Sequence, residues 1–186
     1  MANSIKEELL QEGIILIHSQ LGQDPNNLAS IILSLTELSS SSPTTPIQLF
    51  ITSSVNDQLS MMAIYDTLMS IPNPLIGFGI GHLDNYGTLL LSACDKGKRF
   101  ALKHSVFHLS EPSGYLAPGQ NQETMVSLEY KEISKQRELF ESLLSSHSGR
   151  PISEIHEDIS HNLSYSAEDA LNKGIIDEIL SFKEAN

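Results

Sequence analysis

Hydrophobic residues follow two patterns along the chain, short apolar runs and longer stretches at helical spacing. Runs of four to six apolar residues bounded by turn residues predict buried strands, and they occupy residues 13–17, 47–51, 75–80, 99–102, 105–109 and 175–180. Stretches with apolar residues three and four positions apart predict helices over 26–38, 57–71, 88–94, 123–146, 151 onward and 166–173. Because strands alternate with helices, the fold class is α/β, with a mainly parallel sheet and flanking helices.

Two helix ends carry specific signals. Pro151 suits the first position of the helix that it opens, where its missing N–H costs nothing. The run Ser166-Ala-Glu-Asp169 predicts a capping box, and Gly174 predicts the end of the same helix. A length of 186 residues suits one domain, with residues 1–12 as an N-terminal arm. The stretch 123–146 is too long and too charged to be buried within one small domain, so it is predicted to lie at a subunit contact.

Composition excludes several classes of function. The formal net charge of −12 argues against a nucleic-acid surface and against anionic membranes. Cys94 is the only cysteine, so no internal disulfide forms, and the chain suits a reducing compartment. The first residues are polar and no apolar run is long enough to span a bilayer, which indicates a cytoplasmic protein. The seven histidines lack metal-ligand spacing, so neither a metal nor a cofactor is expected.

The chain is organised around residues 75–94, read as a glycine-spaced strand, a tight turn over 82–87 and a buried helix. Such a turn aims its residues at a helix N-terminus, where unpaired N–H groups and the dipole favour negative charge. Enzymes place nucleophiles and oxyanions there. The residue at the tip is Asn85, which is not a nucleophile.

Several landmarks together resemble one family. They are Ala-Ile-Tyr-Asp-Thr at 63–67, Lys-Gly-Lys-Arg-Phe at 96–100, Leu143-Leu144 with His147 and Gly149, Ser-Ala-Glu at 166–168, and Gly-Ile-Ile-Asp-Glu at 174–178. From residue 9 to 180 the chain resembles the proteolytic subunit of the Clp protease, the ClpP family of the crotonase-like superfold. The resemblance implies one ClpP-like domain over 1–186, with a head (13–112 and 150–180) and a handle (113–149) that contains a protruding helix. It also implies a serine endopeptidase with a Ser-His-Asp triad inside two stacked heptameric rings.

The resemblance places the triad on three residues that do not match it. The family's Gly-x-x-x-Ser-Met-Gly pattern reads Gly81-His-Leu-Asp-Asn85-Tyr-Gly87 here, so Asn85 stands at the serine position. Ser110 stands at the histidine position and Asn162 at the aspartate position. An amide cannot form an acyl-enzyme, a serine alcohol is too weak a base, and Asn162 brings no negative charge. The sequence therefore predicts that the family's catalysis is lost.

Other positions of the family are also altered. The Ser-Pro-Gly-Gly turn that supplies one oxyanion donor reads Ser-Ser-Val-Asn at 53–56, and a β-branched Val55 is unfavourable at positive φ. The second donor, the amide of Tyr86, is retained. The aromatic positions that dock the hexameric ATPase are Gln48 and Phe50, so one aromatic remains. Ser160-His161 replaces a ring-linking Asp-Arg pair.

The leading interpretation is a non-catalytic Clp subunit of the ClpR type found in cyanobacteria and plastids. Its implied partners are a catalytic ClpP paralogue and a Clp-type AAA+ ATPase in homo- or hetero-oligomeric rings, in the cytoplasm, or in the plastid stroma if a targeting segment has been removed. One alternative is a weak serine-type hydrolase with a relocated nucleophile, using His108 or Ser92. Another is a crotonase-like protein that binds acyl-CoA or a peptide.

Overall fold

The computed structural model describes residues 2–18, 25–53, 58–112 and 123–181. The helices are α1 (Ala2–Gln11), α2 (Pro25–Ser41), α3 (Gln58–Ser70), α4 (Asn85–Ser92), α5 (Glu123–Ser148), α6 (Ile152–Ser160) and α7 (Ala167–Asn172). The strands are β1 (Ile14–Ile17), β2 (Ile47–Ile51), β3 (Leu75–Gly79), β4 (His82–Leu83), β5 (Arg99–Leu102), β6 (Val106–His108), β7 (Ser164–Ser166) and β8 (Glu178–Leu180).

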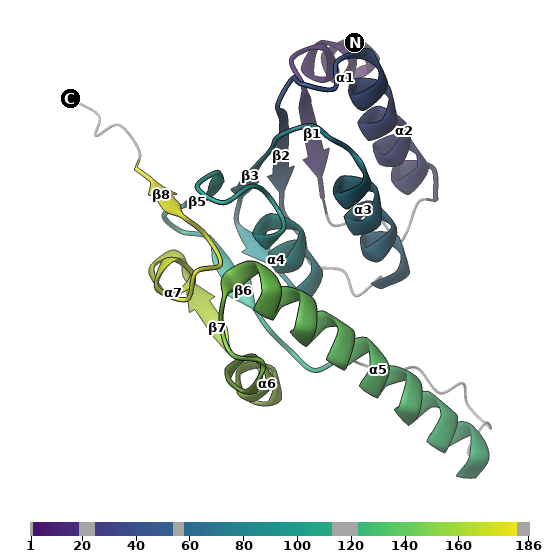
Figure 1. Cartoon of the computed structure of the whole chain (residues 1–186), viewed down its shortest axis with the longest axis vertical. Coiled ribbons are helices and arrows are strands. Elements are labelled where there is room, and N and C mark those ends of the chain that lie inside the picture. Colours follow the sequence, from purple (N-terminus) through teal and green to yellow (C-terminus); the bar gives the residue numbers. More distant parts are fainter. Residues whose placement is uncertain (1, 19–24, 54–57, 113–122, 182–186) are drawn as a thin grey trace.

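Two sheets form the head of the molecule (Figure 1). The larger has the strand order β1-β2-β3-β5-β8, and every neighbouring pair in it is parallel. The smaller has the order β4-β6-β7, with β4 parallel and β7 antiparallel to β6. The predicted α/β class with a mainly parallel sheet and flanking helices is therefore confirmed.

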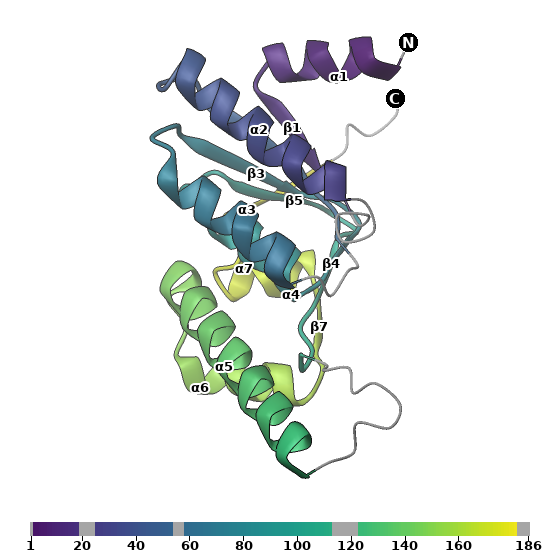
Figure 2. The ribbon, with the colours of Figure 1, turned by 90° about the vertical axis from the view of Figure 1, so that its right-hand side faces the viewer.

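The five-stranded sheet has one covered side. Helices α2 and α3 run along it (Figure 2), and the side chains that alternate toward them are buried, including Ile15, Ile17, Leu49 and Ile51. The side chains that alternate to the opposite side are only half-buried or exposed. This alternation follows from the period of two in a strand, and it identifies which face each strand residue occupies.

Helix α4 is buried along its whole length and packs directly on β3. A Cβ added at Gly77 would lie 2.6 Å from Leu91 Cδ1 and 2.7 Å from Cys94 Sγ, and one at Gly79 would lie 2.9 Å from Leu91 Cδ2. Only glycine leaves room for this approach. The glycine spacing of the strand is thus the reason that the buried helix lies so close to it.

The central turn was predicted incorrectly in part. Residues 82 and 83 form the strand β4, and α4 begins at Asn85 rather than at residue 88. A two-residue strand has too few positions to show a period, and Asn85 and Tyr86 carry no apolar pattern that would have extended the helix. The strand β7 was missed for the same reason.

Other element boundaries also differ from the prediction. Pro151, with ψ of 139°, is the residue before α6 and not its first helical residue, because only its φ of −59° suits a helix. Helix α2 continues to Ser41, beyond the predicted end at residue 38. The last strand starts at Glu178, because Ile175 and Ile176 donate their N–H groups back to the carbonyl of Ala170 and lie in a turn.

The capping box at the start of α7 is confirmed, since the Ser166 hydroxyl accepts from the Asp169 N–H and the Asp169 carboxylate accepts from the Ser166 N–H. Gly174, with φ of +69°, follows the end of this helix as predicted.

Helix α5 protrudes from the head (Figure 1), as the family resemblance implied. Its C-terminal part is anchored by Phe140 and Leu144, which are buried. Near its middle, the Arg137 guanidinium donates to Glu111 Oε1 and Glu141 Oε1, both at 2.7 Å, and to the Ser160 hydroxyl at 2.7 Å. One side chain therefore joins the protruding helix to α6 and to the segment that follows β6.

The buried Arg99 side chain joins the end of the sheet to the end of α5. Its Nε and Nη2 donate to the two oxygens of Asp177, at 2.8 and 2.5 Å, and its Nη1 donates to the carbonyls of Gly174 and His147. The Asp177 carboxylate also accepts from the Gly97 N–H at 2.7 Å. The hydrogen bonds from Arg99 lower the pKa of Asp177, although burial opposes them.

We expect Asp177→Asn to lower the free energy of unfolding by at least about 3 kcal/mol, because one donor of a guanidinium that is 3% exposed then faces an amide. The depressed pKa means that the wild-type contribution is present above the ordinary aspartate value of about 3.9 and is lost as the pH falls below it. Urea unfolding from pH 3 to 7 measures both effects. Glu178→Gln, at an exposed neighbouring acid, is the control, and equal losses in the two variants would contradict this role.

Candidate functional site

Asn85 lies at the junction of the two sheets, as the first residue of α4, and its side chain is buried. Its Nδ2 donates to the Ser110 carbonyl at 2.7 Å, and its Oδ1 accepts from the Ser110 N–H at 2.9 Å. The amide thus pairs with both main-chain groups of one residue, as a neighbouring strand would. The predicted nucleophile and histidine positions are therefore in direct contact, through the main chain of Ser110.

Asn162 contacts the next residue of the same segment. Its Oδ1 accepts from the Glu111 N–H at 3.2 Å, and its φ of +49° is a conformation that asparagine tolerates better than most residues. The side chain is exposed, unlike that of Asn85. The structure thus brings all three predicted triad positions to the main chain of residues 110–111. Their equivalence to a catalytic triad stays a prediction.

The chemistry of this arrangement is that of a structural contact. Both polar groups of Asn85 are already hydrogen-bonded, and an amide nitrogen has no lone pair available for attack. Neither Ser110 nor Asn162 accepts a proton near neutral pH. Asn85 and Asn162 supply hydrogen-bond partners to the main chain of Ser110 and Glu111, where the chain leaves β6.

Asp84 occupies the N-terminus of α4 with its own negative charge. Its Oδ1 accepts from the Gly87 N–H at 2.9 Å and from the Ser53 hydroxyl at 2.6 Å, and the residue is 6% exposed. A Cβ at Gly87 would lie 2.0 Å from the Ser53 Oγ, so glycine is required there. An anion of the protein thus already satisfies the helix terminus that would otherwise stabilise a substrate oxyanion. Sequence reasoning missed Asp84, although an aspartate directly before an apolar helical run is a cap signal.

Tyr86, whose amide is the predicted second oxyanion donor, lies in the first turn of this capped helix. Burial, and then the charge of Asp84, raise the pKa of its phenol to about 12, so the side chain is neutral. A developing oxyanion at this turn would face the Asp84 carboxylate. The other oxyanion position, Val55, lies outside the described residues.

Ser92 and His108, the two residues predicted as alternatives for catalysis, have different environments. Ser92 is buried and its hydroxyl donates to the carbonyl of Leu89 at 2.8 Å, so a substrate cannot reach it. His108 is half-buried on β6, and its Nδ1 lies 2.9 Å from the Ser164 hydroxyl on β7. Of the two, only His108 is placed to meet a solvent-borne molecule.

The predicted ATPase-docking positions lie on the uncovered side of the large sheet. Gln48 and Phe50 are alternate residues of β2 and both are half-buried. The Phe50 ring stacks on Phe78 with centroids 4.6 Å apart, and Phe78 stacks on Phe100 at 5.4 Å. These three rings form an aromatic row across β2, β3 and β5, in register with one another. Sequence reasoning missed Phe78 and Phe100 because their alignment depends on the strand register.

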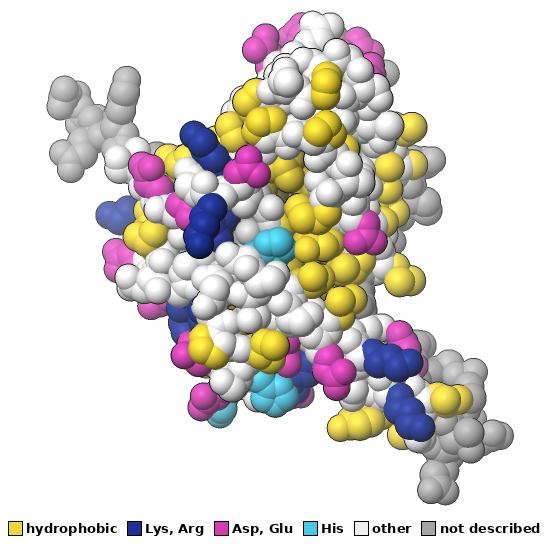
Figure 3. All heavy atoms as spheres, viewed as in Figure 1, with side chains coloured by type: hydrophobic (Ala, Val, Ile, Leu, Met, Phe, Trp, Pro, Cys, Tyr) yellow, Lys and Arg dark blue, Asp and Glu magenta, His cyan; other side chains and the backbone are white. Residues whose placement is uncertain are grey.

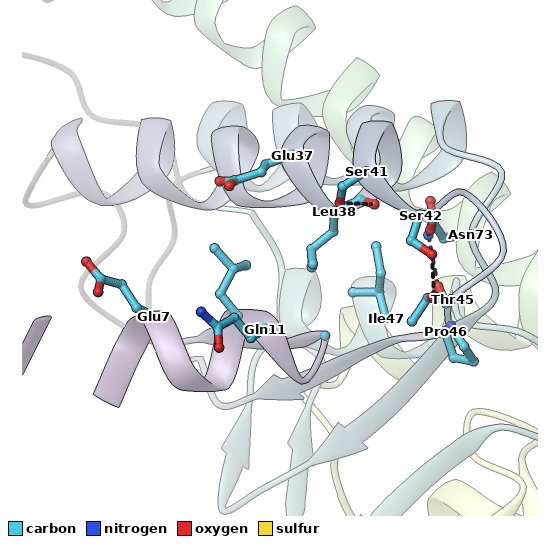
Figure 4. A pocket seen from close by; sticks show the side chains of 12 residues that line it. Glu7, Gln11, Glu37, Leu38, Ser41, Ser42, Thr45, Pro46, Ile47 and Asn73 are labelled. Atoms are coloured by element: carbon cyan, nitrogen blue, oxygen red, sulfur yellow. Dashed lines mark hydrogen bonds between the residues drawn. The ribbon is translucent and has the colours of Figure 1, made fainter. Parts of the chain in front are cut away.

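A cavity of about 350 Å³ lies between α1, the end of α2 and the start of β2 (Figure 4). Glu7 and Gln11 from α1 and Glu37 and Ser41 from α2 are among its lining residues. None of the predicted triad positions lines it. Two carboxylates at its walls disfavour a phosphate-bearing ligand.

The described residues contain no group of three or more metal-ligating side chains placed to hold an ion. Among the same residues, no helix is both long and apolar enough to cross a bilayer.

Substitution of Asn85 by its isostere tests the contact with Ser110. In Asn85→Asp a carboxylate faces the Ser110 carbonyl and adds charge beside Asp84, so we expect a loss of at least about 2 kcal/mol of unfolding free energy at pH 7. The new carboxyl can donate again once protonated, so the deficit should shrink as the pH falls. Asn162→Asp, at an exposed amide that only accepts, is the control and should cost within about 0.5 kcal/mol. A deficit that does not depend on pH would contradict the donor role.

Comparison with known families agrees with the sequence resemblance. The family model described as Clp protease matches residues 1–183 of the 186-residue chain. The match covers both sheets, the buried α4 and the protruding α5. The protein therefore belongs to the Clp protease family.

Proposed function

We propose that the chain is a non-catalytic, structural and regulatory subunit of an ATP-dependent Clp protease complex, comparable to the ClpR type. The observation that carries the proposal is the contact between Asn85 and Ser110. The residue at the nucleophile position uses its amide to hold the main chain at the histidine position. The site thus retains a role in folding that needs no catalysis, and Asp84 adds a charge that opposes an oxyanion.

Exposed apolar side chains support a place in an assembly. On α5 they include Leu128 (57% exposed) and Tyr130 (71%), and on α3 they include Leu59 (82%). Figure 3 shows hydrophobic side chains gathered in the middle of one face, over the α3 and α4 region, and others along the protruding α5. A helix that leaves the head with apolar side chains exposed needs a partner to bury them. Heptameric rings, with a catalytic ClpP paralogue in the same or the opposite ring, supply such partners.

The aromatic row supports docking of a Clp-type AAA+ ATPase. Phe50, Phe78 and Phe100 present half-buried rings on the uncovered side of the sheet, where an apolar side chain of a partner can bind. Gln48 lies on the same side, and its polar side chain makes the apolar surface smaller. The subunit would then bias which ring face the ATPase docks on. The complex would operate in the cytoplasm, or in the plastid stroma if a targeting segment has been removed.

One observation favours a second function, a weak serine-type hydrolase. His108 and the Ser164 hydroxyl are within hydrogen-bond distance, as a base and a nucleophile must be. Labelling of Ser164 by a fluorophosphonate, lost in Ser164→Ala and kept in Ser166→Ala, would favour this function over the proposed one. The acyl-CoA alternative is disfavoured at the cavity beside α1, because Glu7 and Glu37 line it.

We expect the purified protein to hydrolyse neither fluorogenic peptides nor casein, with or without a Clp ATPase. The reason is the amide at position 85 and the lack of a base at Ser110. Peptide release is compared with a catalytic Clp peptidase assayed in parallel and with buffer. Turnover above buffer that Ser164→Ala abolishes would replace the proposed function with the hydrolase.

Ring formation is tested by native mass spectrometry, alone and with a catalytic ClpP paralogue from the same cell. We expect ring-sized masses in at least one of the two samples. The double variant Leu128→Glu with Tyr130→Glu places charges at two exposed apolar positions of α5 and should give smaller species. Glu132→Gln on the same helix is the control and should assemble as the wild type does. A strictly monomeric wild type at micromolar concentration in both mixtures would contradict the proposal.

A further inference from the structure

Two histidines meet on the outer face of the small sheet. Leu83, Phe107 and Tyr165 point to the buried face of β4, β6 and β7, so their neighbours on each strand point outward. His82 on β4 and His108 on β6 are two of these outward residues, with ring centroids 6.1 Å apart and planes inclined by 39°. The histidine pair, His82 and His108, lies outside the contacts that hold Asn85.

A hydrogen bond at Nδ1 orients each ring of the histidine pair. The Nδ1 of His82 lies 2.9 Å from the carbonyl oxygen of Ser53. A carbonyl only accepts, so Nδ1 carries the proton, and in the neutral ring Nε2 holds a free lone pair. The Nδ1 of His108 lies 2.9 Å from the Ser164 hydroxyl, which can accept in the same way. Among the described residues, neither Nε2 atom has a hydrogen-bond partner.

This is the arrangement of histidines that bind a metal ion, in which one nitrogen ligates and the other donates to a carbonyl or similar acceptor. Two imidazoles that share one ion have ring centres no more than about 6.4 Å apart, given metal–nitrogen bonds of about 2.1 Å. The observed 6.1 Å falls within that limit, so the spacing of the two rings is compatible with one shared ion.

The geometry points to a two-histidine site for a late first-row divalent ion, with Nε2 of His82 and of His108 as protein ligands and water in the other positions. Imidazole favours Cu²⁺, Ni²⁺ and Zn²⁺, and affinity among them should be greatest for Cu²⁺. Hard ions such as Mg²⁺ and Ca²⁺ prefer oxygen ligands and should not compete. The site does not depend on peptidase activity or on ring assembly.

Calorimetric titration of the full chain with Cu²⁺ and with Zn²⁺ tests the site. We expect one ion per chain, and at least about a tenfold lower affinity in His82→Gln and in His108→Gln, because even the loss of a residue that only orients a ligand costs about 10- to 100-fold. The matched control is His161→Gln. His161 is exposed and its Nδ1 also lies against a carbonyl, that of Glu157 at 2.8 Å, but the aromatic contacts described give it no second ring. It should bind as the wild type does.

A measurement on the wild type needs no substitution. Zn²⁺ should protect His82 and His108, and not His161, from carbethoxylation read by peptide mass spectrometry. The absence of saturable one-to-one binding would overturn the proposal. Equal affinity in the His82→Gln and wild-type chains, or an equal loss in His161→Gln, would also overturn it, as would protection that does not distinguish the pair from His161.

Discussion

The close packing of α4 on β3 is the constraint on which the rest of the structure depends. Gly77 and Gly79 leave no side chain between the strand and the helix, so Leu91 and Cys94 fill the space that a Cβ would need. The helix is therefore buried from its first residue to its last, and its N-terminus comes to the junction of the two sheets. In such a tightly packed interior, one additional methyl group forces the backbone to shift at a cost of about 1–3 kcal/mol. The position of Asn85 follows from this packing and not from any contact that it makes itself.

The same junction explains what Asn85 contributes to stability. The Ser110 N–H and carbonyl lie beyond the end of β6, and the Asn85 side chain pairs with both. Asn85 supplies a donor and an acceptor in the spacing of a peptide group, which no serine can do. Asn162 supplies only an acceptor, to the N–H of Glu111. The three residues are thus mutually compatible through one short segment of main chain, residues 110–111.

Much of the fold could be predicted from the sequence, for reasons that are visible in particular elements. The strands β1, β2 and β3 are apolar runs bounded by turn residues, and α3 and α5 are long enough to show a helical period. By contrast β4 and β7 have two and three residues, and only pairing with β6 makes them strands. The site shows the same division between local pattern and tertiary contact. Positions 85, 110 and 162 could be aligned with a family motif, whereas the hydrogen bonds that they make could not be predicted. The aromatic row, the cap at Asp84 and the histidine pair depend on register and on side-chain direction, which tertiary packing determines.

Arg137 has a mechanical consequence for the protruding helix. Its guanidinium holds Glu111, Glu141 and Ser160 at one point, roughly midway along a helix of 26 residues. The part of α5 before this point is a lever about 21 Å long, at 1.5 Å per residue, so a rotation of about 10° displaces its tip by roughly 4 Å. Glu111 adjoins Ser110, so the fulcrum of the lever is also the anchor of the segment that Asn85 holds. Any force applied at the tip is therefore transmitted to the junction of the two sheets.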